Sequence, residues 1–155
     1  MFLSIRLYQP ADRESVIRLD QLALSDLSVT GLPRQFDDLK EIETRYLPNG
    51  AFIVAEIDEL IVGMGAIRYI DQDTARINRM RVDPFHRRKG IARAVLNWLE
   101  HQAENAGRSR ILLNTLATLE KAQQLYESHD YVKIGEGEPD GFRVFMYEKR
   151  FGVRT

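Results

Sequence analysis

The chain has 155 residues, 44% of them hydrophobic and 29% charged, a composition typical of one globular domain spanning residues 1–155. It contains no cysteine, which excludes disulfides, thiolate metal sites and a cysteine nucleophile. No apolar run approaches the roughly 20 residues of a membrane helix, and the first residues lack the pattern of a signal peptide. We therefore expect a cytoplasmic protein without a membrane partner.

Hydrophobic periodicity divides the chain into alternating strands and helices. In chain order it predicts a strand at 3–9, helices at 11–24 and 36–47, strands at 51–57, 60–70 and 74–82, a helix at 88–106, a strand at 109–116, a helix at 118–129, and strands at 131–138 and 142–151. This order predicts an α/β (α+β) fold: a single-domain, mixed, mostly antiparallel β-sheet of about seven strands with about four helices on its faces.

The net charge of −1 conceals one strongly basic segment. The chain has 22 basic and 23 acidic residues, but residues 76–93 hold seven basic side chains and a single acidic one, which leaves 15 basic and 22 acidic residues elsewhere. Arg87, Arg88 and Lys89 directly precede Gly90 at the start of a predicted helix. Cations there are unfavourable by about 0.3–1 kcal/mol each unless an anion binds. The free amides of a helix start together with these cations therefore predict a phosphate site, with pyrophosphate as the best match.

Other phosphate-binding motifs are absent or incomplete. There is no G-x-x-x-x-G-K-[ST] sequence, so P-loop chemistry is not expected. Gly63 and Gly65 begin a G-x-G pattern inside a predicted strand without the third glycine, and we interpret them as positions of close packing or of a β-bulge. A polyanion such as DNA requires a broader basic surface, so we expect no nucleic-acid partner.

Two stretches carry a family resemblance. Residues 79–100 (RMRVDPFHRRKGIARAVLNWLE) resemble the central motif of the GNAT superfamily of N-acetyltransferases, in which a strand, V-x-P and R/Q-x-x-G-x-G/A lead into a helix. Residues 120–131 (EKAQQLYESHDY) resemble a second motif of that family, N-x-x-A-x-x-L-Y-x-x-x-G-F. Two positions depart from it: Leu119 stands at the family's asparagine and Asp130 at its glycine.

The resemblance implies acetyl-CoA as the acetyl donor and no metal. Backbone amides at the helix start would hold the pyrophosphate, and the strand end would pair with the pantetheine arm. That arm would enter a gap where the central strand at 74–82 splays from its parallel neighbour at 109–116. The cofactor-binding residues expected on this basis are Met80, Arg81, Val82, Arg87, Arg88, Lys89, Gly90, Ile91, Ala92, Arg93 and Asn114.

The resemblance also assigns Tyr126 as the general acid that protonates the departing CoA sulfur. A phenol with a pKa near ~10 is protonated at neutral pH, which this role requires. The general base is left open, because the strand before V-x-P carries no carboxylate; the candidates are Glu56, Asp73, Glu136 and Glu138. Three scattered histidines without ligand spacing predict no metal site.

The expected reaction is direct transfer of an acetyl group to a primary amine of a small-molecule or amino-acid-like acceptor. Carboxylates in the segments expected to surround the acceptor suit a cationic amine: Asp26, Asp37, Asp38, Glu41, Glu43, Glu136, Glu138 and Asp140. Two alternatives stay open. One is an acetyltransferase for a protein amine, and the other is a non-catalytic acyl-CoA sensor, suggested by Leu119 and the missing strand glutamate. A homodimer is a further expectation.

Overall fold

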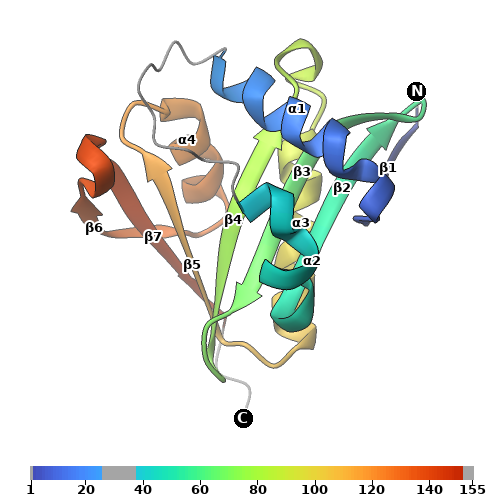
Figure 1. Ribbon diagram of the computed structural model, residues 1–155. Coiled ribbons are helices and arrows are strands. Elements are labelled where there is room, and N and C mark those ends of the chain that lie inside the picture. The colour runs from blue at the N-terminus through green and yellow to red at the C-terminus, as the bar shows by residue number, and fades with distance from the viewer. Residues whose placement is uncertain (1, 26–37, 152–155) are drawn as a thin grey trace.

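A computed structural model describes residues 2–25 and 38–151, and Asp26 and Asp37 lie outside these ranges. One mixed sheet holds seven strands in the order β1-β2-β3-β4-β5-β7-β6, which confirms the predicted fold class (Figure 1). The strands are β1 (Leu3–Leu7), β2 (Gly50–Ile57), β3 (Leu60–Tyr69), β4 (Thr74–Val82), β5 (Arg110–Leu116), β6 (Val132–Gly137) and β7 (Val144–Arg150). The α-helices are α1 (Arg13–Ser25), α2 (Ile42–Arg45), α3 (Ile91–Asn105) and α4 (Glu120–Ser128).

The sheet opens between its two parallel strands. All other neighbouring strands pair antiparallel, whereas β4 and β5 run parallel. Their pairing is confined to Thr74–Arg76 against Arg110–Leu112, after which the strands separate toward their C-terminal ends (Figure 1). The predicted splay of the central strand pair is therefore present.

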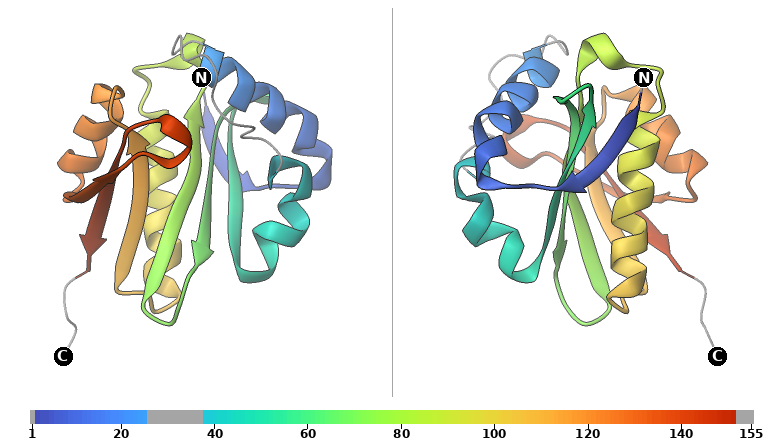
Figure 2. Two further views of the ribbon diagram at one scale, coloured as in Figure 1. Left: turned by 60° about the vertical axis from the view of Figure 1, so that its left-hand side comes forward. Right: turned by 90° about the vertical axis from the view of Figure 1, so that its right-hand side faces the viewer.

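Helices cover both faces of the sheet, so the core has two layers (Figure 2). Helices α3 and α4 pack on one face, where Val95, Leu99 and Tyr126 join Ile77 and Ile111 in one buried cluster. Helices α1 and α2 lie on the other face, and their apolar residues pack on the second cluster: Val16, Leu19, Leu39, Ile42, Tyr46, Phe52, Val54 and Met64.

Two glycines of β3 allow α3 to lie close to the sheet. A Cβ atom at Gly63 would stand 2.7 Å from Ile91 Cγ2, and one at Gly65 would stand 2.7 Å from Val95 Cγ1. The register between β3 and β4 also shifts at Met64/Ala66, so Gly65 lies opposite a β-bulge. The structure thus confirms both interpretations of these glycines.

The predicted helix boundaries needed two corrections. The part of the 36–47 segment that is described contains a 3₁₀ turn (Asp38–Glu41) and the single turn of α2, not one continuous helix. The long helix begins at Ile91 and not at Arg88, because Arg88 and Gly90 have φ angles of 64° and 76° in the left-handed region. Its C-terminal end is as expected: Gly107 has φ 79°, and the amide of Arg108 donates to the carbonyl of Ala103 at 3.0 Å, as in a Schellman motif.

Candidate active site

A cavity of about 990 Å³ occupies the gap between β4 and β5. Its walls come from both strands, from the loop after β4, and from the facing ends of α3 and α4. Ile77, Met80 and Leu113 face the α3 side of the sheet, whereas Arg79 and Arg81 face α1 and α2. The cavity therefore reaches from one face of the sheet to the other.

The start of α3 presents free backbone donors to this cavity. Its first helical hydrogen bond runs from the amide of Ala94 to the carbonyl of Gly90 at 3.0 Å, and no side chain caps this end. The amides of Ile91, Ala92 and Arg93 therefore have no partner within the helix, and the helix dipole adds positive potential there. A Cβ atom at Gly90 would meet nothing within 4 Å, so glycine serves here for its positive φ and not for space.

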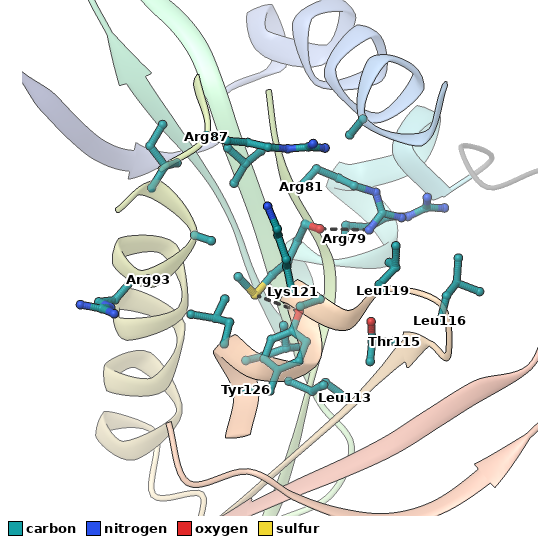
Figure 3. A pocket seen from close by; sticks show the side chains of 18 of the residues that line it. Arg79, Arg81, Arg87, Arg93, Leu113, Thr115, Leu116, Leu119, Lys121 and Tyr126 are labelled. Carbon is teal, nitrogen blue, oxygen red and sulfur yellow. Dashed lines mark hydrogen bonds between the residues drawn. The ribbon is translucent and has the colours of Figure 1, made fainter. Parts of the chain in front are cut away.

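Tyr126 of α4 lines this cavity. Its hydroxyl contacts Met80 Sδ at 3.8 Å (Figure 3), and its ring is within 5.8 Å of the Tyr131 ring and 6.2 Å of the Tyr147 ring, measured between centroids. The residue is 7% exposed. Burial raises the pKa of Tyr126 to about 12, while the Arg81 charge partly offsets this effect. The hydroxyl is therefore a proton donor at every pH at which the protein is ordinarily studied.

A charged network lies behind the cavity wall on the α1 side, and sequence reasoning missed it. Arg79 Nε donates to Asp38 Oδ2 at 3.0 Å, and its Nη2 also donates to Asp38. Arg79 Nη1 lies 3.3 Å from Asp20 Oδ2, while Arg81 Nε donates to Asp20 Oδ1 at 2.8 Å. Asp20 is fully buried. The available signal was its position one helical turn after Val16, on the apolar face of α1, where a carboxylate requires a partner.

The structure brings most predicted cofactor residues to one cavity. The predicted residues that line this cavity are Met80, Arg81, Val82, Arg87, Arg88, Gly90, Ile91, Ala92, Arg93 and Asn114, together with Tyr126. Lys89 is absent from this wall. Asn114 is exposed on the face of β5 that looks away from α3.

The candidate bases lie elsewhere. Glu56 pairs with Arg6, Glu136 pairs with Arg143, and Asp73 belongs to the turn before β4, where its carbonyl accepts from the amide of Ser109 at 2.9 Å. None of the four candidates, Glu138 included, lines the cavity.

The carboxylates expected around the acceptor are also engaged. Glu43 pairs with Arg13, Glu41 pairs with Arg45 at 2.7 Å, and Asp38 pairs with Arg79. None of these three carboxylates lines the cavity. These three carboxylates therefore do not form the cavity wall, whereas Asp26 and Asp37 lie outside the described residues.

Leu119 and Asp130, the two departures in the second motif, lie at the two ends of α4. Leu119 precedes α4 and lines the cavity, and it provides no side-chain cap. Asp130 has φ 71°, so it adopts the left-handed conformation that the turn requires. In the described ranges, no group of three or more metal-ligating side chains is present, and no helix is long and apolar enough to cross a membrane.

The splayed parallel strands, the uncapped helix start and the buried tyrosine lie around one cavity in a mixed α/β fold. Comparison with known sequences identifies the family. Residues 16–131 match the Acetyltransferase (GNAT) family, so the chain belongs to the GNAT acetyltransferase family.

Relatives with sequence similarity are N-acetyltransferases. The chain is 40% identical over 102 residues to the uncharacterized N-acetyltransferase YsnE of Bacillus subtilis, covering 61% of this chain and 65% of that protein. It is 34% identical over 106 residues to human N-acetyltransferase 8, covering 64% and 47%. It is 36% identical over 104 residues to the N-acetylaspartate synthetase of Danio rerio, covering 65% and 37%. The chain thus spans less than two thirds of the length of each.

Solved structures share the fold at lower identity. An acetyltransferase from Streptococcus agalactiae has a TM-score of 0.87 at 22% identity, covering 96% of this chain and 98% of that one. YncA from Salmonella typhimurium, solved with acetyl-CoA, has a TM-score of 0.81 at 18% identity, covering 100% and 97%.

Proposed function

We propose that the protein is an acetyl-CoA-dependent N-acetyltransferase that moves an acetyl group directly to a primary amine of a small-molecule or amino-acid-like acceptor. One observation carries the proposal: a cavity between the splayed strands is lined both by the free amides of a helix start and by a buried tyrosine. The similarity to N-acetylaspartate synthetases supports an amino-acid-like acceptor.

In this proposal the two ends of acetyl-CoA bind to different parts of the cavity. The pyrophosphate binds the amides of Ile91, Ala92 and Arg93, and the exposed cations Arg87 and Arg88 stand beside it. The pantetheine arm lies against Met80, Arg81 and Val82, where β4 has no pairing with β5. Lys89 lies outside the cavity wall and contributes its positive charge. Asn114 lines the cavity from the face of β5 that looks away from α3.

The proposed chemistry needs one acid on the protein. The acceptor nitrogen attacks the thioester carbon, the new C–N bond forms and the C–S bond breaks. The sulfur leaves as a thiolate and takes the proton of the Tyr126 hydroxyl. The phenolate then recovers a proton from the ammonium that the attack created, by way of solvent. The contact between Tyr126 and Met80 Sδ supports this role, because it places the hydroxyl beside β4 in the gap.

No carboxylate near Tyr126 is assigned as a base. Glu120 is the only carboxylate among the described residues of the cavity wall, and it lies in the first turn of α4. A primary amine with pKa near ~10 retains a small neutral fraction at pH 7, and orientation of that fraction supplies much of the rate.

The test is thiol release from acetyl-CoA with a panel of amines, alongside calorimetric titration of CoA. Binding of CoA with amine-dependent thiol release supports the proposal. Binding without turnover on any amine or peptide favours the acyl-CoA sensor, and absence of CoA binding by folded protein rejects both. Cytoplasmic location and a homodimer stay predictions.

A further inference from the structure

The arginines around the cavity form two groups on opposite faces of the sheet, and Lys121 of α4 is a further cation in the wall. Arg93 belongs to α3, and Arg87 and Arg88 precede that helix. Arg79 and Arg81 instead point toward α1 and α2, as Figure 3 shows, and both contact Asp20 of α1. The phosphate ligand proposed above accounts for the first group. It leaves the second group without a function.

The carboxylates paired with the second group do not face the cavity. Arg79 and Arg81 line it, whereas Asp20 and Asp38 do not. Asp20 is fully buried, and both of its oxygens accept from arginines. Both oxygens of Asp38 accept from Arg79, and Tyr46 donates to one of them as well. Asp20 and Asp38 thus bind the guanidinium groups from outside the cavity wall, and the arginines themselves line the cavity.

Arg81 retains binding capacity within this network. Its Nε donates to Asp20 at 2.8 Å, and its Nη1 donates to the carbonyl of Met80 at 3.0 Å. Its Nη2 group has no hydrogen-bond partner among the described residues, and the side chain is 25% exposed. An arginine fixed at two of its nitrogens loses little conformational entropy when the third binds a carboxylate oxygen.

Arg81 also lines the same cavity as Tyr126, where the reaction is proposed to occur. Arg81 bonds the carbonyl of Met80, and the Met80 side chain contacts the Tyr126 hydroxyl at 3.8 Å. In an amino acid, one carbon separates the amine from the carboxylate. A carboxylate bound to Arg81 would therefore place the amine inside the cavity that Tyr126 also lines.

We infer that the acceptor is an amino acid whose carboxylate binds Arg81, and that Asp20 and Arg79 position this arginine. The inference rests on the proposed function and names its substrate class. Simple amines and polyamines, which carry no anion for this wall, are then poor acceptors.

The experiment compares acceptors that differ only at the carboxylate. Thiol release from acetyl-CoA is measured with the standard amino acids, and the best is then compared with its decarboxylated amine and its carboxamide. For methionine these are 3-(methylthio)propylamine and L-methioninamide. We expect the amino acid to have the higher kcat/KM by about 10- to 100-fold, the range of a charge-assisted hydrogen bond.

Variants assign the preference to Arg81. Arg81→Gln should lower kcat/KM for the amino acid by about 10- to 100-fold more than it lowers kcat/KM for the decarboxylated amine. Arg81→Lys, which keeps the charge, should retain part of the preference. Arg150→Gln is the matched control, because Arg150 lies at the far end of β7 and is outside the cavity wall. Calorimetry with the N-acetyl amino acid and CoA gives a second measurement that needs no turnover.

The outcomes separate the inference from the proposed function. Acetylation of amines with equal or better rates for the decarboxylated acceptors overturns the inference and leaves the acetyltransferase standing. An equal loss on both acceptors in Arg81→Gln shows a structural role and also overturns it. If no acceptor is acetylated and the N-acetyl amino acid does not bind the CoA-loaded protein, both proposals fail.

Discussion

Replacing Tyr126 by phenylalanine should lower the rate of acetyl transfer and leave the free energy of unfolding nearly unchanged. The hydroxyl makes one described contact, to Met80 Sδ at 3.8 Å, which is a weak acceptor at long range. Its removal should therefore change the free energy of unfolding by no more than about 1 kcal/mol. The buried ring keeps its packing on Tyr131 and Tyr147.

The effect on the reaction should be far larger. A general acid contributes typically about 10²- to 10⁴-fold to a rate, so we expect kcat to fall by that factor while KM for acetyl-CoA stays nearly constant. Burial raises the pKa of Tyr126 from about 10 to about 12, which corresponds to about 3 kcal/mol against the phenolate. The pH–rate profile of the wild type should therefore show no loss of this acid below pH ~10.

The assay is thiol release under saturating acetyl-CoA, paired with denaturant unfolding of the same samples. Tyr131→Phe is the matched control, since Tyr131 is a buried neighbour that does not line the cavity. Wild-type kcat in Tyr126→Phe would refute the reasoning. So would a loss of activity that Tyr131→Phe reproduces, or one that follows a loss of folded protein.

Three further predictions concern the network, the helix start and alkaline pH. Asp20→Asn removes a buried charge that pairs with the partly buried Arg79 and Arg81, and it should lower the free energy of unfolding by roughly 2–3 kcal/mol in urea titrations; exposed Glu14→Gln on the same helix should not. Gly90→Ala forces a Cβ into the left-handed region and should cost about 1–2 kcal/mol of stability and weaken CoA binding in calorimetry, and unchanged stability would contradict the observed φ of 76°. Burial raises the pKa of Tyr8, Tyr126 and Tyr147 to about 12 in the folded protein. Tyrosines of the unfolded chain have pKa values of about 10, so above pH ~10 the unfolded chain binds fewer protons than the folded protein does. Stability should accordingly be fully retained below pH ~10 and fall as pH rises toward 12, and a flat denaturation midpoint between pH 9 and 11.5 would be inconsistent with these shifts.

Local sequence patterns were sufficient to predict the strand–loop–helix unit that holds the residues proposed to bind the cofactor. The run from Met80 to Arg93 keeps its residues close in space because a strand end, a short loop and a helix start follow directly in the chain. Alternation and apolar runs also predicted every strand, although β6 has no buried residue. They failed at the exact start of α3, where two left-handed residues delay the helix.

Only the tertiary structure decided which charged side chains line the cavity. Asp20 meets Arg79 and Arg81 across 59 and 61 residues of chain, a separation at which no periodicity or local motif carries information. The same holds for the carboxylates that composition suggested for amine recognition, because their partners, such as Arg13 for Glu43, are chosen by packing. Residue types alone determine which charges the chain carries. The fold determines which of these charges pair with each other outside the cavity and which of them line the cavity.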